Sequence, residues 1–421
     1  MAGTIGATGT IGDPVSELPL LARLTGVMET VVVQPTPFCN IACTYCYLPS
    51  RNTKSVMSVD TVEVLFRKIF ASHFPAREMT VIWHAGEPLV VAVDFYRRAF
   101  DVIEAMRPGP LRLRHAFQTN GMLITPVWCD FFKRYQVSVG VSIDGPREWH
   151  DAHRVTRSGG GTYERTIAGI RMLQRHDVPF HVISVLSAAH LDDPERLLNF
   201  YADEGIGDVC FNVEESEGDH VSGLFAASDL RARYTRFLDR FWSVARKSGK
   251  FRFLREIDSM LTRIFRPNEA TMRNIQVVPF AMLNVDCHGN VSSFSPELLG
   301  YKNADYADFL VGNILTDELE DMVASPAMQA MIRDIDAGVE ACRRECEYYS
   351  VCGGGAPVNK LTERGSFRAT QTSYCALTQM VPVDVVLAAF ERAERNPEAL
   401  RSFFESQGDA SQSPPHPVPA E

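Results

Sequence analysis

The chain has 421 residues, of which 45% are hydrophobic and 22% are charged, and its formal net charge is -10 at pH 7. This length and apolar content predict an ordinary globular protein with room for a large domain and a smaller one. The negative charge argues against a broad nucleic-acid-binding surface. The cysteines are clustered, no charged leader precedes an apolar core, and no run approaches the roughly 20 apolar residues of a membrane span. These features predict a cytoplasmic protein without a membrane segment.

Short β-rich runs alternate with amphipathic helical stretches from residue 29 onward, which is typical of βα units around a parallel sheet. The predicted strands are 30–34, 79–84, 111–119, 137–143, 180–186 and 209–213. The predicted helices are 59–71, 94–106, 126–134, 162–176, 194–204 and 229–248. Six units without a seventh and eighth predict an α/β fold built on an open, partial (β/α)6 barrel. Ligands in such folds bind at the carboxyl ends of the strands.

Three cysteines follow the first predicted strand with the spacing C-x3-C-x2-C: Cys39, Cys43 and Cys46. A loop with this spacing can wrap around one metal cluster. A closed iron-sulfur electron carrier uses four thiolates, whereas three leave one iron free to bind a substrate or cosubstrate. Buried cysteines or a zinc site are the alternatives.

Further motifs follow the next predicted strands, at the same edge of the sheet. Residues 83–88 read Trp-His-Ala-Gly-Glu-Pro, residues 118–121 read Gln-Thr-Asn-Gly, and residues 142–146 read Ser-Ile-Asp-Gly-Pro. Each alone is compatible with a turn. By the same reasoning, Arg154 could form a surface salt bridge, and His150 and His153 fit a solvated loop. The acidic run 214–217 is either a solvated loop or a patch that receives a peptide.

Together these motifs resemble those of the radical S-adenosylmethionine (SAM) enzymes. In that family, three thiolates hold a [4Fe-4S] cluster whose open iron binds the amino and carboxylate groups of SAM. Reductive cleavage then gives methionine and a 5'-deoxyadenosyl radical that abstracts a hydrogen atom from the substrate. The resemblance implies SAM contacts from Tyr45, Gly86, Glu87, Asn120, Ser142 and Arg154. The family has a glycine where this chain has Ala85, a change that matters little if Ala85 has a negative φ.

A second set of four cysteines lies in a loop-rich segment: Cys342, Cys346, Cys352 and Cys375. By count, they suit zinc or [4Fe-4S] equally. The segment is similar to the SPASM domain of peptide and sulfatase maturases, which commonly holds two auxiliary [4Fe-4S] clusters. This chain has Ala356, Phe294 and Ser295 where that pattern expects a cysteine, a cysteine and an aspartate. The resemblance therefore implies one auxiliary cluster, held by the four cysteines.

Several segments look like a narrower group, the maturases that form cyclophanes in Gly-rich-repeat precursors. They include 83–88, 117–121, 211–215, 294–300 and 352–360. In that group, the β-carbon of one residue is joined to the aromatic ring of the residue two positions earlier. The likeness implies a ribosomally made precursor peptide as substrate and a one-electron reductant such as a flavodoxin or a ferredoxin. Glu297 and Asp286 are the candidate bases for the proton that the ring loses.

Other reactions stay open at this point. A sulfatase maturase makes formylglycine with an aspartate base, but the corresponding residue here is Ser295, a poor base. Thioether formation usually accompanies a second auxiliary cluster. A non-catalytic iron-sulfur or zinc scaffold is the alternative from another class. Cys129 and Cys210 fit core positions, whereas Cys287, before a glycine turn, could contact a cluster or the substrate.

The expected organisation has six parts along the chain. A flexible arm, 1–26, precedes the partial barrel, 27–228, and a helical bridge, 229–270, follows it. The SPASM-like domain is expected at 271–381, a C-terminal helix at 382–405, and a disordered tail at 406–421, which is rich in Ser, Pro and Gln.

Overall fold

The computed structural model describes residues 20–216, 220–268 and 272–394. The predicted tail, most of the N-terminal arm, the end of the predicted C-terminal helix and Glu217 lie outside these ranges.

Ten strands form one sheet in the order β10-β9-β8-β1-β2-β3-β4-β5-β6-β7. Its central strands pair in parallel, in chain order. They are β1 (Met28–Val33), β2 (Pro75–Trp83), β3 (Arg112–Thr119), β4 (Ser138–Ser142), β5 (Phe180–Leu186) and β6 (Asp208–Val213). A parallel pair needs a long crossover, and helices supply it here. The predicted partial (β/α)6 barrel is therefore confirmed.

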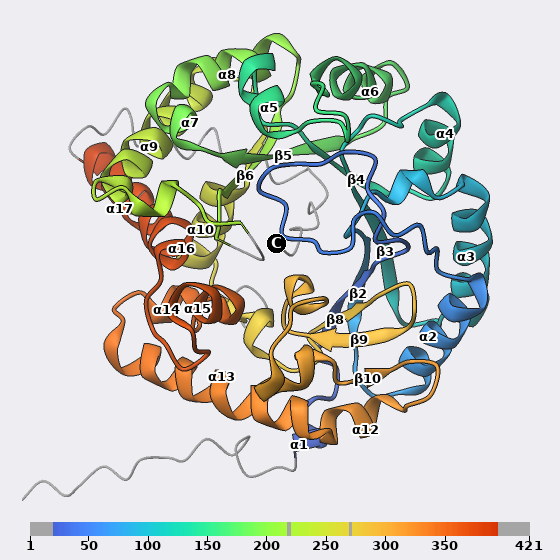
Figure 1. Cartoon of the computed structure of the whole chain (residues 1–421). Coiled ribbons are helices and arrows are strands. Elements are labelled where there is room, and N and C mark those ends of the chain that lie inside the picture. The colour runs from blue at the N-terminus through green and yellow to red at the C-terminus, as the bar shows by residue number, and fades with distance from the viewer. Residues whose placement is uncertain (1–19, 217–219, 269–271, 395–421) are drawn as a thin grey trace, which may run out of the picture.

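The crossover helices surround the strands as an outer ring (Figure 1). They are α2 (Val59–Ala71), α3 (Val93–Met106), α4 (Pro126–Arg134), α6 (Tyr163–Arg175), α8 (Pro194–Asp203) and α9 (Leu230–Ser248). The helix α2 shows why these segments fold as predicted. Ser58 caps its first turn by accepting a hydrogen bond from the Thr61 amide, and Leu65, Phe66 and Ile69 are buried on one face.

Two short helices at the carboxyl ends of the strands were not predicted. They are α5 (Arg147–His153) and α7 (Ala188–Asp192). The region predicted as a helical bridge contains a strand as well as helices: β7 (Phe253–Leu254) pairs in parallel with β6, and α10 (Arg255–Phe265) follows directly.

The C-terminal part of the chain joins the same sheet. Its strands are β8 (Met282–Val285), β9 (Asn290–Ser293) and β10 (Gly312–Asn313), and β8 pairs in parallel with β1, with Asn284 beside Val32. The edge of the sheet at β1 is therefore covered by β8. Contacts between the two parts of the chain are fixed by backbone hydrogen bonds as well as by side chains.

Helices of the C-terminal part, drawn in orange and red, lie on the side of the ring that runs from α9 to β10 (Figure 1). They are α12 (Leu319–Ala324), α13 (Pro326–Glu345), α14 (Tyr349–Cys352), α15 (Pro357–Arg364), α16 (Ser373–Cys375) and α17 (Val381–Glu394). Among the described residues, the helical stretch Ser373–Ala393 is long and apolar enough, by length and composition alone, to cross a membrane, with a mean hydropathy of 1.4 over an 18-residue window. Half of it is buried, and α17 packs on α9 and α10, as a core helix does.

Candidate active site

The first cysteine loop lies across the carboxyl ends of the central strands. Backbone hydrogen bonds tie it to the neighbouring loops: the Glu87 amide donates to Phe38 O at 2.9 Å, and the Ala42 amide donates to Val155 O at 2.8 Å. The Thr44 amide donates to the His153 carbonyl at 3.0 Å. The loops after β2 and β4 thus fix the backbone on which the three thiols stand.

The three thiols belong to one small packed group with Ile41 and Met122. Burial, with Glu87 nearby, raises the pKa of Cys39 to about 12, and burial raises the pKa of Cys43 to about 11. A coordinating metal ion deprotonates such thiols outright, so the residues fit a thiolate-bound metal group. Within the described ranges, no three His, Cys, Asp or Glu side chains are arranged compactly enough for a single ion. Three thiols on one loop are the ligand set of a cluster that leaves one iron without a protein ligand.

Glu87 is almost completely buried and joins the loops after β2 and β3. Its Oε1 accepts hydrogen bonds from the Leu89 amide (2.9 Å) and from the Thr119 hydroxyl (2.7 Å), and its Oε2 accepts one from the Asn120 amide (2.8 Å). Burial raises the pKa of Glu87 to about 7, although these three hydrogen bonds oppose the rise. Hydrogen bonds to the charged form of such a carboxylate favour that form, and an amino group bound to iron still has N–H groups to donate.

Gly86 allows the closest approach between this loop and the cysteine loop. Its φ is +98°, and a Cβ there would lie 2.2 Å from the Thr36 carbonyl oxygen. Ala85, next to it, has a φ of +65°. The condition under which the missing glycine would matter little is therefore not met: Ala85 occupies the left-handed region, which is strained for a residue with a Cβ.

Asn120 and Ser142 come from the ends of β3 and β4. The Asn120 Nδ2 donates to Asn40 Oδ1 at 2.7 Å and lies 3.9 Å from Cys39 Sγ. The Ser142 hydroxyl accepts a hydrogen bond from Gln118 Nε2 at 2.9 Å. Asn120 therefore contacts the cysteine loop, whereas Ser142 contacts Gln118 on β3.

Arg154 and Asp144 form a buried ion pair beneath the cysteine loop. The Arg154 Nε donates to Asp144 Oδ2 at 2.9 Å and its Nη2 donates to Oδ1 at 3.1 Å, while Nη1 lies 4.0 Å from Cys43 Sγ. The Tyr45 hydroxyl donates to the same carboxylate, and the Val185 amide donates to it at 3.0 Å. Burial pushes the pKa of Asp144 upward, but the Arg154 guanidinium and its hydrogen bonds hold that pKa below its ordinary value. The surface salt bridge considered for Arg154 is wrong.

His150 is also buried rather than solvated, so that interpretation of the sequence is wrong as well. It lies on α5, where Nδ1 accepts from the Asp144 amide at 3.3 Å and Nε2 is 2.9 Å from Thr162 Oγ1. Burial lowers the pKa of His150 to about 4, which keeps the ring neutral. His153 is more exposed, and its Nδ1 lies 3.0 Å from Thr44 Oγ1.

The four C-terminal cysteines converge around the end of α13. Cys352 and Cys375 share a hydrogen bond, which lowers the pKa of Cys352 to about 6 and raises that of Cys375. The Gly355 amide donates to Cys352 Sγ at 3.1 Å. Cys346 lies at the helix terminus and is close enough to Cys342 to raise its pKa, a smaller effect than burial. These residues fit an anionic metal-thiolate group.

Comparisons with known proteins are consistent with this geometry. Residues 33–201 match the model of the Radical SAM superfamily. An uncharacterized protein of Synechocystis, sll1766, is 39% identical over 87% of this chain and 93% of its own length.

The chain belongs to the radical SAM superfamily.

Two other similarities connect this radical SAM enzyme to maturases. The serine-type anaerobic sulfatase-maturating enzyme of Bacteroides thetaiotaomicron is 26% identical over 79% of this chain and 83% of its own length. The solved structure of native anSMEcpe with bound AdoMet and Cp18Cys peptide has a TM-score of 0.71 at 18% identity, and covers 88% of this chain and 99% of that chain. The chain thus shares its fold with this maturase structure over 88% of its length, and the match extends through the C-terminal SPASM-like region.

The segment that departs from the SPASM pattern is buried in this radical SAM enzyme. Phe294 is fully buried with a φ of +71°, and the Ser295 hydroxyl donates to Glu297. Asp286 accepts hydrogen bonds from the His288 amide (2.8 Å) and from the Asn290 amide (2.9 Å). Glu297 therefore accepts a hydrogen bond from a hydroxyl, whereas Asp286 accepts hydrogen bonds from backbone amides of the turn in which it lies.

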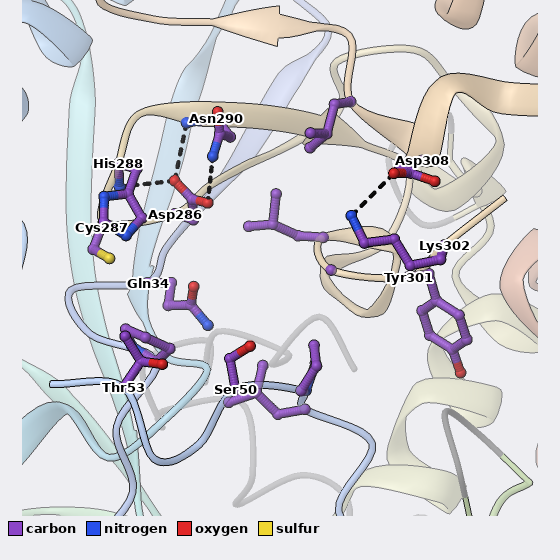
Figure 2. A pocket seen from close by; sticks show the side chains of 16 residues that line it. Gln34, Ser50, Thr53, Asp286, Cys287, His288, Asn290, Tyr301, Lys302 and Asp308 are labelled. Atoms are coloured by element: carbon purple, nitrogen blue, oxygen red, sulfur yellow. Dashed lines mark hydrogen bonds and ion pairs between the residues drawn. The ribbon is translucent and has the colours of Figure 1, made fainter. Parts of the chain in front are cut away.

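A cavity of about 240 Å³ separates the cysteine loop from the β8–β9 turn. Figure 2 shows Asp286, Cys287 and His288 on this turn, across the cavity from Ser50 and Thr53. Cys287 lies there, and burial raises its pKa to about 11, so its thiol is protonated at neutral pH. Cys129 and Cys210, in contrast, are fully buried in the barrel wall.

Sequence reasoning did not identify three groups near the two cysteine sets. Asp144 lies in the motif at residues 142–146, but no function was predicted for it, although its carboxylate binds Arg154. His84, at the end of β2, has a buried Nδ1 without a hydrogen-bond partner among the described residues. Lys360 is 3% exposed and contacts Cys342. The sequence gives one signal for Lys360: a lysine that follows Cys352 and its glycine turn by only a few residues.

Proposed function

We propose that this radical SAM enzyme crosslinks a ribosomally made precursor peptide by forming a three-residue cyclophane. A hydrogen atom leaves the β-carbon of one substrate residue, and that carbon bonds to the aromatic ring of the residue two positions earlier. The ring then loses one proton and one electron to become aromatic again. When bound, the [4Fe-4S] cluster and SAM supply the adenosyl radical that takes the hydrogen atom.

Contacts within the chain support a role for each of the predicted site residues. Cys39, Cys43 and Cys46 would hold the SAM-binding cluster, and Glu87 offers a buried carboxylate to the SAM amino group. Arg154 is fixed on one edge by Asp144, which leaves Nη1 beside the cysteine loop. We assign Tyr45, Gly86, Asn120 and Ser142 to the same SAM site.

The observation that carries this proposal is Ser295 at the place of the expected aspartate, bound to Glu297 in a buried turn. A serine is a poor base for deprotonating a thiol or a hydroxyl, which formylglycine formation requires. Glu297, or alternatively Asp286, would accept the proton from the ring. The four C-terminal cysteines would hold one auxiliary [4Fe-4S] cluster that accepts the electron.

Formylglycine formation remains the second candidate, because the curated relative from Bacteroides thetaiotaomicron is a sulfatase-maturating enzyme. In that reaction, Glu297 would deprotonate the substrate hydroxyl through Ser295. Thioether crosslinking is the third candidate. We also retain the cytoplasmic location and the flavodoxin or ferredoxin reductant as proposals.

One experiment separates these reactions. The enzyme is produced anaerobically with reconstituted clusters and incubated with SAM, a reductant and a precursor that carries aromatic-x-x triads. Cyclophane and formylglycine formation both remove two hydrogen atoms from a serine-containing substrate, so mass alone does not distinguish them. A hydrazide probe labels only the aldehyde, and tandem mass spectrometry shows missing fragmentation within a crosslinked triad. Labelling by the hydrazide without a protected triad would contradict the proposal, and a triple variant with Cys39, Cys43 and Cys46 replaced by Ala is the inactive control.

A further inference from the structure

Lys360 is a buried cation placed directly against one of the four C-terminal cysteines. Only 3% of the residue is exposed. Its Nζ lies 3.2 Å from Cys342 Sγ and 3.3 Å from the Gly338 carbonyl oxygen. Among the residues that the structure describes, the lysine ion pairs join Lys68 to Glu318 and Lys302 to Asp308, and Lys360 forms none.

A buried ammonium group without a negative partner is unfavourable, so the neighbouring group should be anionic. A cluster with four cysteine thiolates has a net negative charge, and its reduction potential depends on net charge, burial and hydrogen bonds to sulfur. A cation that donates to a ligating sulfur stabilises the reduced form, which has one more negative charge, more than the oxidised form. The Gly355 amide acts in the same direction on Cys352, but it has no net charge.

We propose that Lys360 raises the reduction potential of the auxiliary cluster, so that the cluster can accept the electron that the substrate ring gives up. This inference rests on the proposed function, in which the ring releases one electron and one proton after the carbon-carbon bond forms. The electron reduces the auxiliary cluster, which gains one negative charge, and the proton goes to the carboxylate base. Lys360 takes no part in bond making and acts through the Cys342 sulfur.

The test measures the potential of the auxiliary cluster alone. In the full chain with Cys39, Cys43 and Cys46 changed to Ala, only the auxiliary cluster can assemble, and it should bring about four irons. Potentials come from a redox titration followed by electron paramagnetic resonance. The variants compared are Lys360→Met, Lys360→Gln, Lys360→Arg and, as a surface control, Lys247→Met.

Lys360→Met should lower the reduced-to-oxidised ratio at least tenfold at the midpoint potential of the parent, a shift of about 59 mV for one electron. Lys360→Arg should restore most of the shift, and Lys247→Met should leave the potential unchanged. A Lys360→Met protein with a full iron content and the parent potential overturns the inference. Loss of the cluster in both Lys360→Met and Lys360→Gln, with folding intact, also overturns it, because Lys360 would then serve assembly.

Failure of the proposed function looks different. If the parent with Lys360 intact binds no iron, the auxiliary cluster does not exist, and both ideas fall together. If the potential shifts as expected but no crosslinked peptide forms with the complete enzyme, the role of Lys360 stands and the cyclophane reaction does not.

Discussion

Replacing Arg154 by Met should destabilise the protein strongly, because Asp144 would stay behind as a buried charge. The side chain of Asp144 is 0% exposed and that of Arg154 is 8% exposed. Removing one partner of a buried ion pair typically costs about 3–5 kcal/mol. The two hydrogen bonds from Arg154 to Asp144 are charge-assisted, and at about 1.5–3 kcal/mol each their loss would cost a similar amount. This is a large part of the roughly 5–15 kcal/mol that keeps a protein folded.

The pH dependence tests the electrostatic origin of this loss. Arg154 holds the pKa of Asp144 low, so in the wild type the pair contributes stability above the ordinary aspartate pKa and loses it as pH falls through the lowered one. In Arg154→Met, burial is no longer opposed by the guanidinium and raises the pKa of Asp144. The stability difference between the two proteins should therefore shrink as pH falls through the raised pKa of Asp144 in the variant.

The assay is urea unfolding of the cluster-free proteins, so that bound groups do not contribute. Asp144→Asn combined with Arg154→Met should be more stable than Arg154→Met alone, because the amide removes the unpaired charge but keeps an acceptor for Tyr45. The coupling between the two sites should be about 1–3 kcal/mol. A loss below about 1 kcal/mol for Arg154→Met, or no relief from the second change, would refute this reasoning.

Three further predictions concern other parts of the site. Gly86→Ala should cost about 2–4 kcal/mol and abolish 5'-deoxyadenosine formation, since its Cβ would clash with a backbone carbonyl, whereas Gly109→Ala, with nothing within 4 Å, should be neutral in the same assays. Glu87 contributes stability that is present below pH 4.5 and lost as pH rises through about 7, so Glu87→Gln should remove about 3 kcal/mol of pH dependence from urea unfolding. Glu297→Gln should lower the yield of crosslink per 5'-deoxyadenosine at least tenfold, and Asp286→Asn tests the other candidate base; an unchanged yield in both would mean that neither accepts the proton.

The sequence predicts the parallel sheet well because each βα unit carries its own periodic pattern. Helices such as α2 and α4 begin and end at the predicted residues, since a capping serine and an N-terminal proline mark them locally. The cysteine loop was recognisable for the same reason: its spacing is local. The pairing of β8 with β1 could not be predicted, because the two strands are far apart in the chain and neither has a sequence feature that identifies the other as its partner.

The errors share a physical cause. His150 and Arg154 are polar and follow a glycine turn, which favours exposure on average, yet both are buried around Asp144. Burial of polar groups depends on partners that complete their hydrogen bonds, and these come from elsewhere in the chain. Ala85 has a positive φ next to Gly86, which packs closely against Thr36, and such contacts between loops are not visible in a local sequence pattern.

Helix α15 links the two halves of the proposed reaction. Asn359 donates a hydrogen bond to Glu215, which follows β6 at the edge of the barrel, whereas Lys360, one residue later, faces Cys342. Adjacent helical residues point about 100° apart, so one turn of helix can serve both sides. A short helix that holds the barrel edge through one residue and the second cysteine set through the next fixes the distance between them. Such a fixed distance is what electron transfer from a substrate in the barrel to a second cluster requires.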